Sequence, residues 1–212
     1  MNLRQKGLEQ TRQQLKTSFT RDILIIQTIR TIDELITIIN TLLENLRERY
    51  GYYAPRIAKQ EDTETLLSAV KTKQQDDLGV SFTEEDLLSI QHLATAIEGL
   101  TNLEQHQEAY LERLMKGVCP KLQEAATCTI GARLLSRAGS LRHLAELPSS
   151  TIQVLGAERA LFRHLKTGAK APKFGVIFSH PSLTEAQEKG KTARKLAGKI
   201  ALAARQDYYG HH

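Results

Sequence analysis

The chain has 212 residues, of which 41% are hydrophobic, 25% are charged and 5% are aromatic, and it contains no Trp. This composition supports a folded core but excludes a membrane-spanning protein, because a bilayer helix needs about 20 consecutive apolar residues and no apolar run here approaches that length. The net charge of +5 is uneven, because residues 131–212 hold 14 Lys and Arg against five Asp and Glu. Such a basic block attracts polyanions, and nucleic acid is the first candidate.

The ends of the chain and its cysteines indicate an intracellular protein. Met1 leads directly into polar residues, so we expect no signal peptide and a cytoplasmic location. Cys119 and Cys128 lie nine residues apart with no CxxC partner, and we interpret them as buried reduced thiols rather than as a disulfide or a metal site. No metal and no cofactor are expected. His211 and His212 resemble the remnant of a purification tag, so we leave them out of the predicted domains.

A repeat of apolar residues predicts a first long helix. Between residues 25 and 50 apolar side chains recur in alternating steps of four and three, which is typical of a coiled-coil seam. We expect a helix over residues 19–50 that stops at Gly51, with Pro55 beyond it. The positions predicted to mediate self-association are Ile25, Ile29, Ile32, Ile36, Ile39 and Leu43. A hairpin within one chain would bury the same stripe, so both interpretations stay open.

A second long helix is predicted after a short polar segment. A helical candidate spans about 62–73, and Thr83 followed by three acids reads as a helix N-terminus. The helix that begins there should run to about Lys116 and return antiparallel to the first. Residues 1–118 are therefore predicted to form a coiled-coil domain with a tip insertion near 51–82.

The basic half is predicted to be a compact helical domain at residues 119–210, which makes the fold class all-α. Helices are expected at 125–137, 141–147, 157–166 and from 186 to about 208, and residues 174–178 are expected to be extended. In the helix at 157–166, Ala160, Leu161 and Leu165 should point one way and Arg159, Arg163 and Lys166 the other. A basic loop with Lys170, Lys173 and Phe174 follows.

This pattern suits phosphates and an unstacked base, because arginines one helical turn apart precede a lysine-bearing loop with an aromatic residue. A solvated basic face is the alternative interpretation. His164 could equally be a surface or packed histidine, and Phe174 could belong to the core.

The second half resembles the NOP domain. The segments 131–135, 138–141 and 147–153 follow the family pattern, and the string GAERALFRHLK at 156–166 is highly specific for it. The match continues through 172–178 and 190–205, while 22–30 and 46–51 resemble the coiled-coil region of the same proteins. The chain thus resembles a core protein of box C/D guide-RNA ribonucleoproteins, in an archaeal form because it lacks the charged tail of the nucleolar relatives.

The resemblance implies a set of partners. In the family the coiled coil pairs two copies, and the NOP domain binds a kink-turn RNA together with a small ribosomal-protein-like kink-turn binder. A separate N-terminal domain, which this chain lacks, holds the methyltransferase fibrillarin. The implied RNA-binding residues are Arg159, Arg163, His164, Lys166, Lys170, Lys173 and Phe174. The implied interface with RNA and the small protein contains Ser149, Ser150, Gly156 and Ala157.

The sequence raises three possible classes of function. The first is a non-catalytic scaffold of a ribonucleoprotein that directs 2'-O-methylation. The second is a coiled-coil interaction protein whose basic domain docks an acidic protein. An enzyme is the third, and it is not expected, because the sequence shows no Gly-rich phosphate loop, no metal-spaced His/Cys set and no nucleophile with a matched base.

Overall fold

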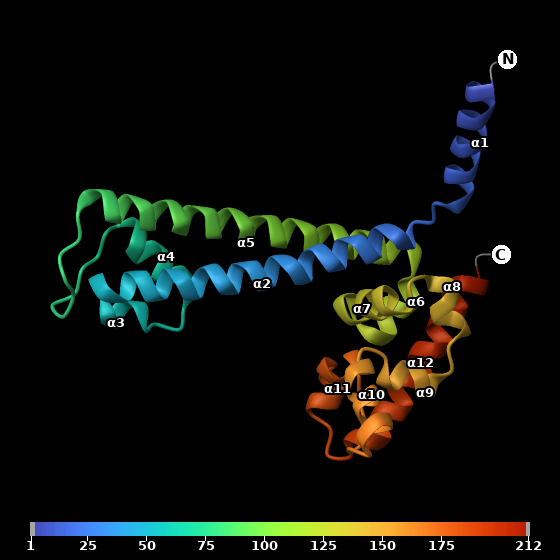
Figure 1. Ribbon diagram of the computed structural model, residues 1–212. Coiled ribbons are helices and arrows are strands. Elements are labelled where there is room, and N and C mark those ends of the chain that lie inside the picture. The colour runs from blue at the N-terminus through green and yellow to red at the C-terminus, as the bar shows by residue number, and fades with distance from the viewer. Residues whose placement is uncertain (1–2, 211–212) are drawn as a thin grey trace. The chain divides into compact units, whose positions relative to one another are not determined.

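The computed structural model describes residues 3–210, and every regular element in this range is helical (Figure 1). The expected all-α class is therefore confirmed for these residues. The first helices are α1 (Leu3–Ser18), α2 (Asp22–Tyr53), α3 (Pro55–Ala58), α4 (Thr63–Lys71) and α5 (Glu84–Val118). The later ones are α6 (Pro120–Ala126), α7 (Cys128–Ala138), α8 (Leu141–Glu146), α9 (Ser149–Val154), α10 (Glu158–Thr167), the 3-10 helix η1 (Val176–Ser179), α11 (Pro181–Thr184) and α12 (Lys189–Tyr209). The two terminal histidines interpreted as a tag remnant lie outside the described residues.

The chain divides into two compact units. One unit is Thr31–Ala109, which we call the hairpin. The other combines the residues up to Arg30 with those from Tyr110 onward, and we call its part from Tyr110 to Gly210 the lobe. The division expected at residues 118 and 119 stays a prediction. None of the helices within residues 3–210 is both long and apolar enough to cross a bilayer.

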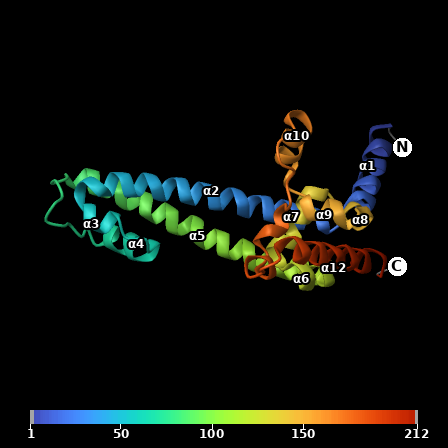
Figure 2. The same cartoon turned by 90° about the horizontal axis from the view of Figure 1, so that it is seen from below.

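In the hairpin, α2 and α5 run side by side in opposite directions (Figures 1 and 2). Helix α2 does not stop at Gly51 as predicted but continues to Tyr53, since Gly51 does not adopt a positive φ and the amide of Ala54 still donates to the carbonyl of Tyr50 at 2.8 Å. The buried core joins α2, α4 and α5 through the following residues: Leu35, Ile39, Leu46, Tyr50, Tyr53, Leu66, Leu67, Val70, Leu87, Ile90, Ala94 and Ile97.

The residues of the predicted self-association seam occupy different environments. Ile25, Ile29, Ile32 and Ile39 are buried within the single chain, whereas Ile36 and Leu43 are half-buried. Ile38, which the seam did not include, keeps 47% of its surface exposed. Self-association stays a prediction, and exposed positions such as Ile38 are where a second copy could add apolar contacts.

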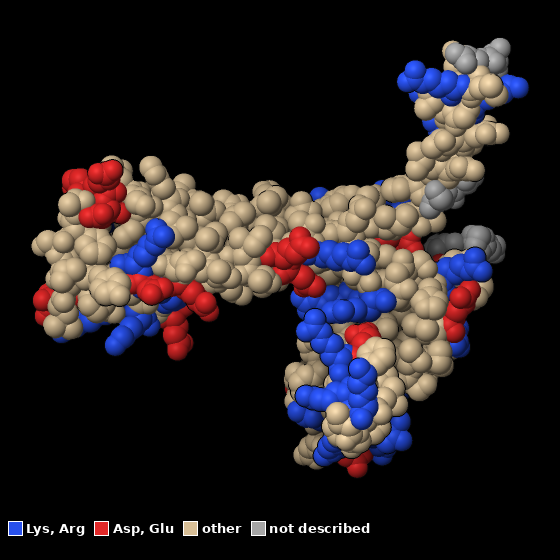
Figure 3. Space-filling view, viewed as in Figure 1, with Lys and Arg blue, Asp and Glu red and all other residues tan. Residues whose placement is uncertain are grey.

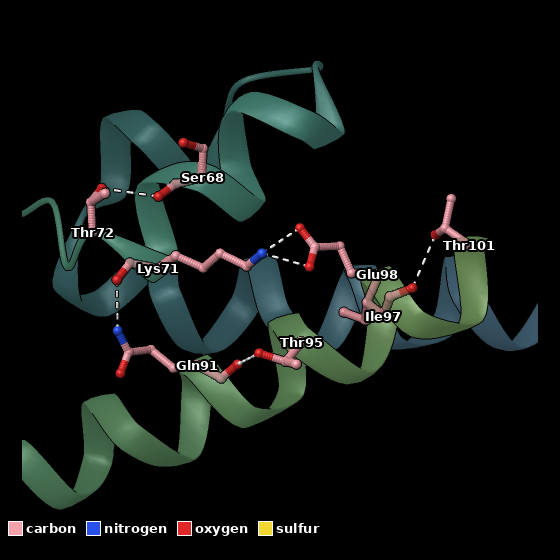
Figure 4. Close-up of polar contacts among 8 residues, drawn as sticks. All are labelled: Ser68, Lys71, Thr72, Gln91, Thr95, Ile97, Glu98 and Thr101. Carbon is pink, nitrogen blue, oxygen red and sulfur yellow. Dashed lines mark hydrogen bonds and ion pairs between the residues drawn. The ribbon is translucent and has the colours of Figure 1, made fainter. Parts of the chain in front are cut away.

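Capping and an ion pair fix the tip segment against α5. Thr83 accepts the amide hydrogen of Asp86 at 3.2 Å, and Asp86 accepts that of Thr83 at 3.1 Å, so the predicted N-cap forms a reciprocal capping box. Lys71 at the end of α4 lies 2.5 Å from a carboxylate oxygen of Glu98 (Figure 4). Gln91 donates to the carbonyl of Lys71 at 2.8 Å (Figure 4). These contacts hold α4 along the side of α5.

The lobe is built around α12, which packs against α6, α8 and α9; Figure 2 shows α12 lying alongside α6. The single helix predicted over 125–137 is wrong, because Thr127 adopts φ 68° and separates α6 from α7. Gly139 caps the end of α7 and Ser140 caps the start of α8. Cys119 is buried and Cys128 is half-buried, and neither forms a disulfide.

Two buried carboxylates in this unit accept hydrogen bonds from backbone amides that have no partner within their own helix. Asp207 of α12 accepts the amide hydrogens of Lys121 and Leu122 at the start of α6, at 3.1 and 2.7 Å. Asp22 in the first turn of α2 accepts that of Leu141 at the start of α8, at 2.8 Å. The first turns of a helix leave amide groups without partners inside the helix, so each carboxylate ties two distant segments together.

Candidate nucleic-acid interface

Helix α10 carries three of the predicted RNA-binding cations on its surface. Gly156, at φ 94°, ends the preceding segment, and its amide donates to the carboxylate of Glu158 at 2.7 Å. Gly168, in the left-handed conformation, caps the other end and donates to His164 at 2.9 Å. The cationic side chains are exposed along this helix at Arg159, Arg163 and Lys166.

The apolar face of α10 is not covered. The sequence predicted that Leu161 and Leu165 lie on the side of the helix opposite its cations, and α10 contains no buried residue. Leu161 is 38% exposed, Leu165 is 71% exposed, and the neighbouring Phe162 is 64% exposed. Contiguous exposed apolar side chains of this kind mark contact surfaces, so α10 offers apolar contacts as well as positive charge. Sequence reasoning missed Phe162, whose signal was an aromatic residue on a short, strongly charged helix.

The basic loop after α10 is held at both of its ends by side chains. His164 bonds through Nδ1 to the carbonyl of Ala169, which places this predicted RNA-binding residue in a structural contact. Gln153 of α9 donates to the carbonyl of Lys173 at 2.9 Å. Between these two points the side chains of Lys170 and Lys173 are exposed.

The aromatic part of the site differs from the prediction. Residues 176–179 form a 3-10 helix rather than an extended strand, because their amides bond locally, as at Phe178 to Gly175 at 3.0 Å. Phe174 is half-buried and stacks on Phe178, with ring centroids 5.6 Å apart and planes 26° apart. Phe178 is the more exposed ring, and Lys189 lies 5.5 Å from its centroid.

The first turns of α12 continue the basic surface. A shallow hollow of about 690 Å³ is lined there by Glu188, Lys189, Gly190, Lys191, Arg194 and Lys195. Because Lys189 also reaches Phe178, this hollow adjoins the aromatic pair. Figure 3 shows Lys and Arg side chains gathered over the lobe. These α12 cations were visible in the sequence as a basic helix but were not among the predicted site residues.

The residues predicted to contact a protein partner lie beside this surface. Ser149 and Ser150 are exposed in the first turn of α9. Gly156 and Ala157 are half-buried at the junction between α9 and α10. The residues predicted to contact RNA or its protein partner thus all belong to one stretch of the lobe, from α9 through the loop. Within residues 3–210, no group of three or more His, Cys, Asp or Glu side chains is placed to hold a metal ion.

The chain is thus an all-helical protein whose lobe carries exposed cations beside a stacked aromatic pair, a surface suited to a polyanion. Residues 14–212 match the family model described as "Nop: snoRNA binding domain, fibrillarin", and the chain belongs to this family.

Several known proteins are similar to the chain. Nucleolar protein 58 of Sclerotinia sclerotiorum is 36% identical over 88% of this chain and 38% of its own length. An uncharacterized NOP5 family protein of Methanocaldococcus jannaschii is also 36% identical, over 91% of this chain and 53% of its own length. A crystal structure described as a fibrillarin/Nop5p complex superposes with a TM-score of 0.60 at 25% identity, covering 99% of this chain and 70% of that chain.

The chain thus spans about half or less of the length of these two relatives. Because both relatives share the same identity with it, the archaeal form inferred from the sequence stays a prediction. The expected cytoplasmic location also stays a prediction.

Proposed function

We propose that this chain is a non-catalytic scaffold of a box C/D guide-RNA ribonucleoprotein, which binds a kink-turn RNA together with its small kink-turn-binding protein. The observation that carries the proposal is the combination on α10 of exposed cations with exposed Phe162 and Leu165. Cations suit phosphates, whereas apolar side chains suit a protein surface or an unstacked base. A surface with both features fits a composite partner made of RNA and protein.

The residues divide into two roles under this proposal. Arg159, Arg163, Lys166, Lys170 and Lys173 neutralise phosphates, while Ser149 and Ser150 face the small protein. The hairpin supports a second function, which is to pair two copies and thereby hold two RNA motifs at a fixed distance. Fibrillarin, which the description of the similar crystal structure names, is assigned to neither the hairpin nor the lobe.

The charge of the two units supports the placement of RNA on the lobe. Residues 31–109 hold 15 Asp and Glu against six Lys and Arg, whereas residues 110–210 hold 17 Lys and Arg against seven Asp and Glu. An RNA backbone is attracted to a basic surface and repelled by an acidic one.

The test is a double charge reversal, Arg163→Glu with Lys166→Glu, measured by RNA affinity at several salt concentrations in the presence of the small protein. Each lost phosphate contact should reduce the salt dependence by about one unit. Arg4→Glu with Arg12→Glu on α1 makes the same change in charge elsewhere and should bind normally. RNA binding that is unchanged by the α10 reversal would overturn the residue assignment. If both double variants lost RNA affinity equally, the loss would reflect the net charge of the protein and not contacts made by α10.

A further inference from the structure

The end of α9 and the end of the basic loop are joined by three hydrogen bonds. The backbone amides of Gly175 and Val176 donate to the carbonyls of Gln153 and Leu155, at 2.9 and 2.8 Å. The side-chain amide of Gln153 donates to the carbonyl of Lys173 at 2.9 Å. Because a helix leaves its last carbonyls without partners, the two backbone bonds satisfy the end of α9 while they fix the loop.

The two segments approach so closely that only glycine fits at the contact. A Cβ at Gly175 would lie 2.0 Å from the carbonyl oxygen of Leu155, and one at Gly156 would lie 2.5 Å from a methyl group of Val176. Both segments are also anchored in the lobe, because Ile152 before Gln153 and Ile177 after Val176 are fully buried. The packing of the lobe therefore holds both segments of this contact in place.

Gln153 is the one side chain in this contact that reaches the cationic residue itself. Its amide donates to the carbonyl of Lys173, the residue directly before Phe174. Gln153 also belongs to the same short helix as Ser149 and Ser150, which are proposed to face the small protein. It thus connects the residues proposed for RNA with those proposed for protein.

We infer that Gln153 is a positioning residue of the RNA-binding surface: through its bond to the Lys173 carbonyl it orients Lys173 and Phe174 for RNA, while it contributes no cation to the surface. This inference rests on the proposed function. A preorganised contact group costs less to order on binding, so loss of the bond should weaken binding without removing a phosphate contact.

The experiment compares three variants of the full chain with the wild-type protein. Gln153→Met keeps the length of the side chain but removes the donor. Gln153→Glu carries a donor only when its carboxyl is protonated. Gln105→Met makes the same chemical change on an exposed position of α5 and serves as the control. Each is measured for affinity toward a kink-turn RNA bound by the small protein, and for hydrogen exchange at the amides of Gly175 and Val176.

Gln153→Met should weaken RNA binding roughly threefold to tenfold, which is the range for one neutral hydrogen bond. Its salt dependence should match that of the wild type, because no cation is lost, whereas Lys173→Ala should lower that dependence by about one unit. Exchange at Gly175 and Val176 should be faster in Gln153→Met. Gln153→Glu should bind at least as weakly at pH 7, because its carboxylate repels the Lys173 carbonyl oxygen and the phosphates, and it should recover toward the wild type near pH 4.5, where a Glu carboxyl group is partly protonated.

Two failures are distinguishable. If Lys173→Ala weakens binding but Gln153→Met binds and exchanges like the wild type, the positioning role is overturned and the proposed function stands. If the wild-type chain does not bind the RNA–protein complex at all, the proposed function is overturned, and this inference with it.

Discussion

The carboxylate of Asp207 accepts the backbone amide hydrogen of Leu122 at 2.7 Å, although the two residues stand 85 positions apart. Asp207 is only 4% exposed, and it also accepts the amide of Lys121 at 3.1 Å. A carboxylate at a helix N-terminus satisfies amides that have no partner within the helix and interacts favourably with the helix dipole. One side chain of α12 therefore fixes the position of α6 in the lobe.

Removal of this carboxylate should destabilise the lobe. We expect Asp207→Ala to lower the free energy of unfolding by about 2–3 kcal/mol, because two buried amides lose a charged acceptor. Asp207→Asn keeps one acceptor and should cost about half as much. Urea unfolding followed by circular dichroism measures both, with Glu124→Ala at an exposed position of α6 as the control. Wild-type stability in Asp207→Ala would show that water or another group satisfies these amides.

Two glycines of the lobe should respond in opposite directions to alanine. At Gly175 a Cβ would meet the Leu155 carbonyl oxygen at 2.0 Å, so Gly175→Ala must displace the loop and should lower both the melting temperature and RNA affinity. At Gly198, inside α12, nothing lies within 4 Å of an added Cβ, so Gly198→Ala should stabilise the protein by up to about 1 kcal/mol. Thermal unfolding distinguishes the two, and a shift of the same sign in both would contradict the described geometry.

Stability of the hairpin should fall in strong alkali because of Tyr50. Burial raises the pKa of Tyr50 from 10.0 to about 12, with the nearby Tyr53 and Asp76 adding to the effect, and its hydroxyl donates to the Ala69 carbonyl at 3.1 Å. A pKa that is higher in the folded state means that the unfolded state loses its proton first. The stabilisation is thus complete below pH 10 and is lost as the pH rises from 10 to about 12.

The matched variant is Tyr50→Phe, which should cost about 1–2 kcal/mol at pH 7 through the lost hydrogen bonds. The difference in unfolding free energy between this variant and the wild type should shrink between pH 10 and 12. A constant difference across that range would show that the hydroxyl is not buried as described.

The coiled-coil pattern of the sequence predicted α2 and α5 well, because a stripe of apolar residues over several turns specifies a helix regardless of its partner. The Thr83 cap was likewise predicted from local chemistry. The break at Thr127 was not, since a β-branched residue rarely adopts φ 68°, and only tertiary contacts can impose it.

The sequence predicted which cations the candidate site contains, but it did not predict how the side chains are arranged. Arg163 and Lys166 are exposed as expected, because burying an unpaired charged side chain costs free energy. The exposure of Leu165 ran against the usual rule, as an apolar residue on an amphipathic helix normally turns inward. The bond from Gln153 to Lys173 joins residues 20 positions apart, and a contact over that separation cannot be predicted from a local sequence pattern.

The exposed apolar residues of the hairpin give a test of self-association. Ile38→Asp should lower the mass of the protein in solution if two copies pair through this face, and it should leave helicity unchanged because Ile38 is 47% exposed. Ile97→Asp places a charge at a fully buried position and should unfold the hairpin. Light scattering and circular dichroism measure the two effects. A wild-type protein that is already monomeric at high concentration would exclude pairing.

The most direct test of the central claim is a gel shift with a box C/D kink-turn RNA, with and without the small kink-turn-binding protein. The proposed composite surface predicts that the chain shifts the RNA strongly only when the small protein is bound, and that Arg163→Glu with Lys166→Glu abolishes this second shift. If folded wild-type protein at low salt gives no further shift on the RNA–protein complex, the scaffold assignment is contradicted and the basic lobe is a docking face for an acidic protein instead.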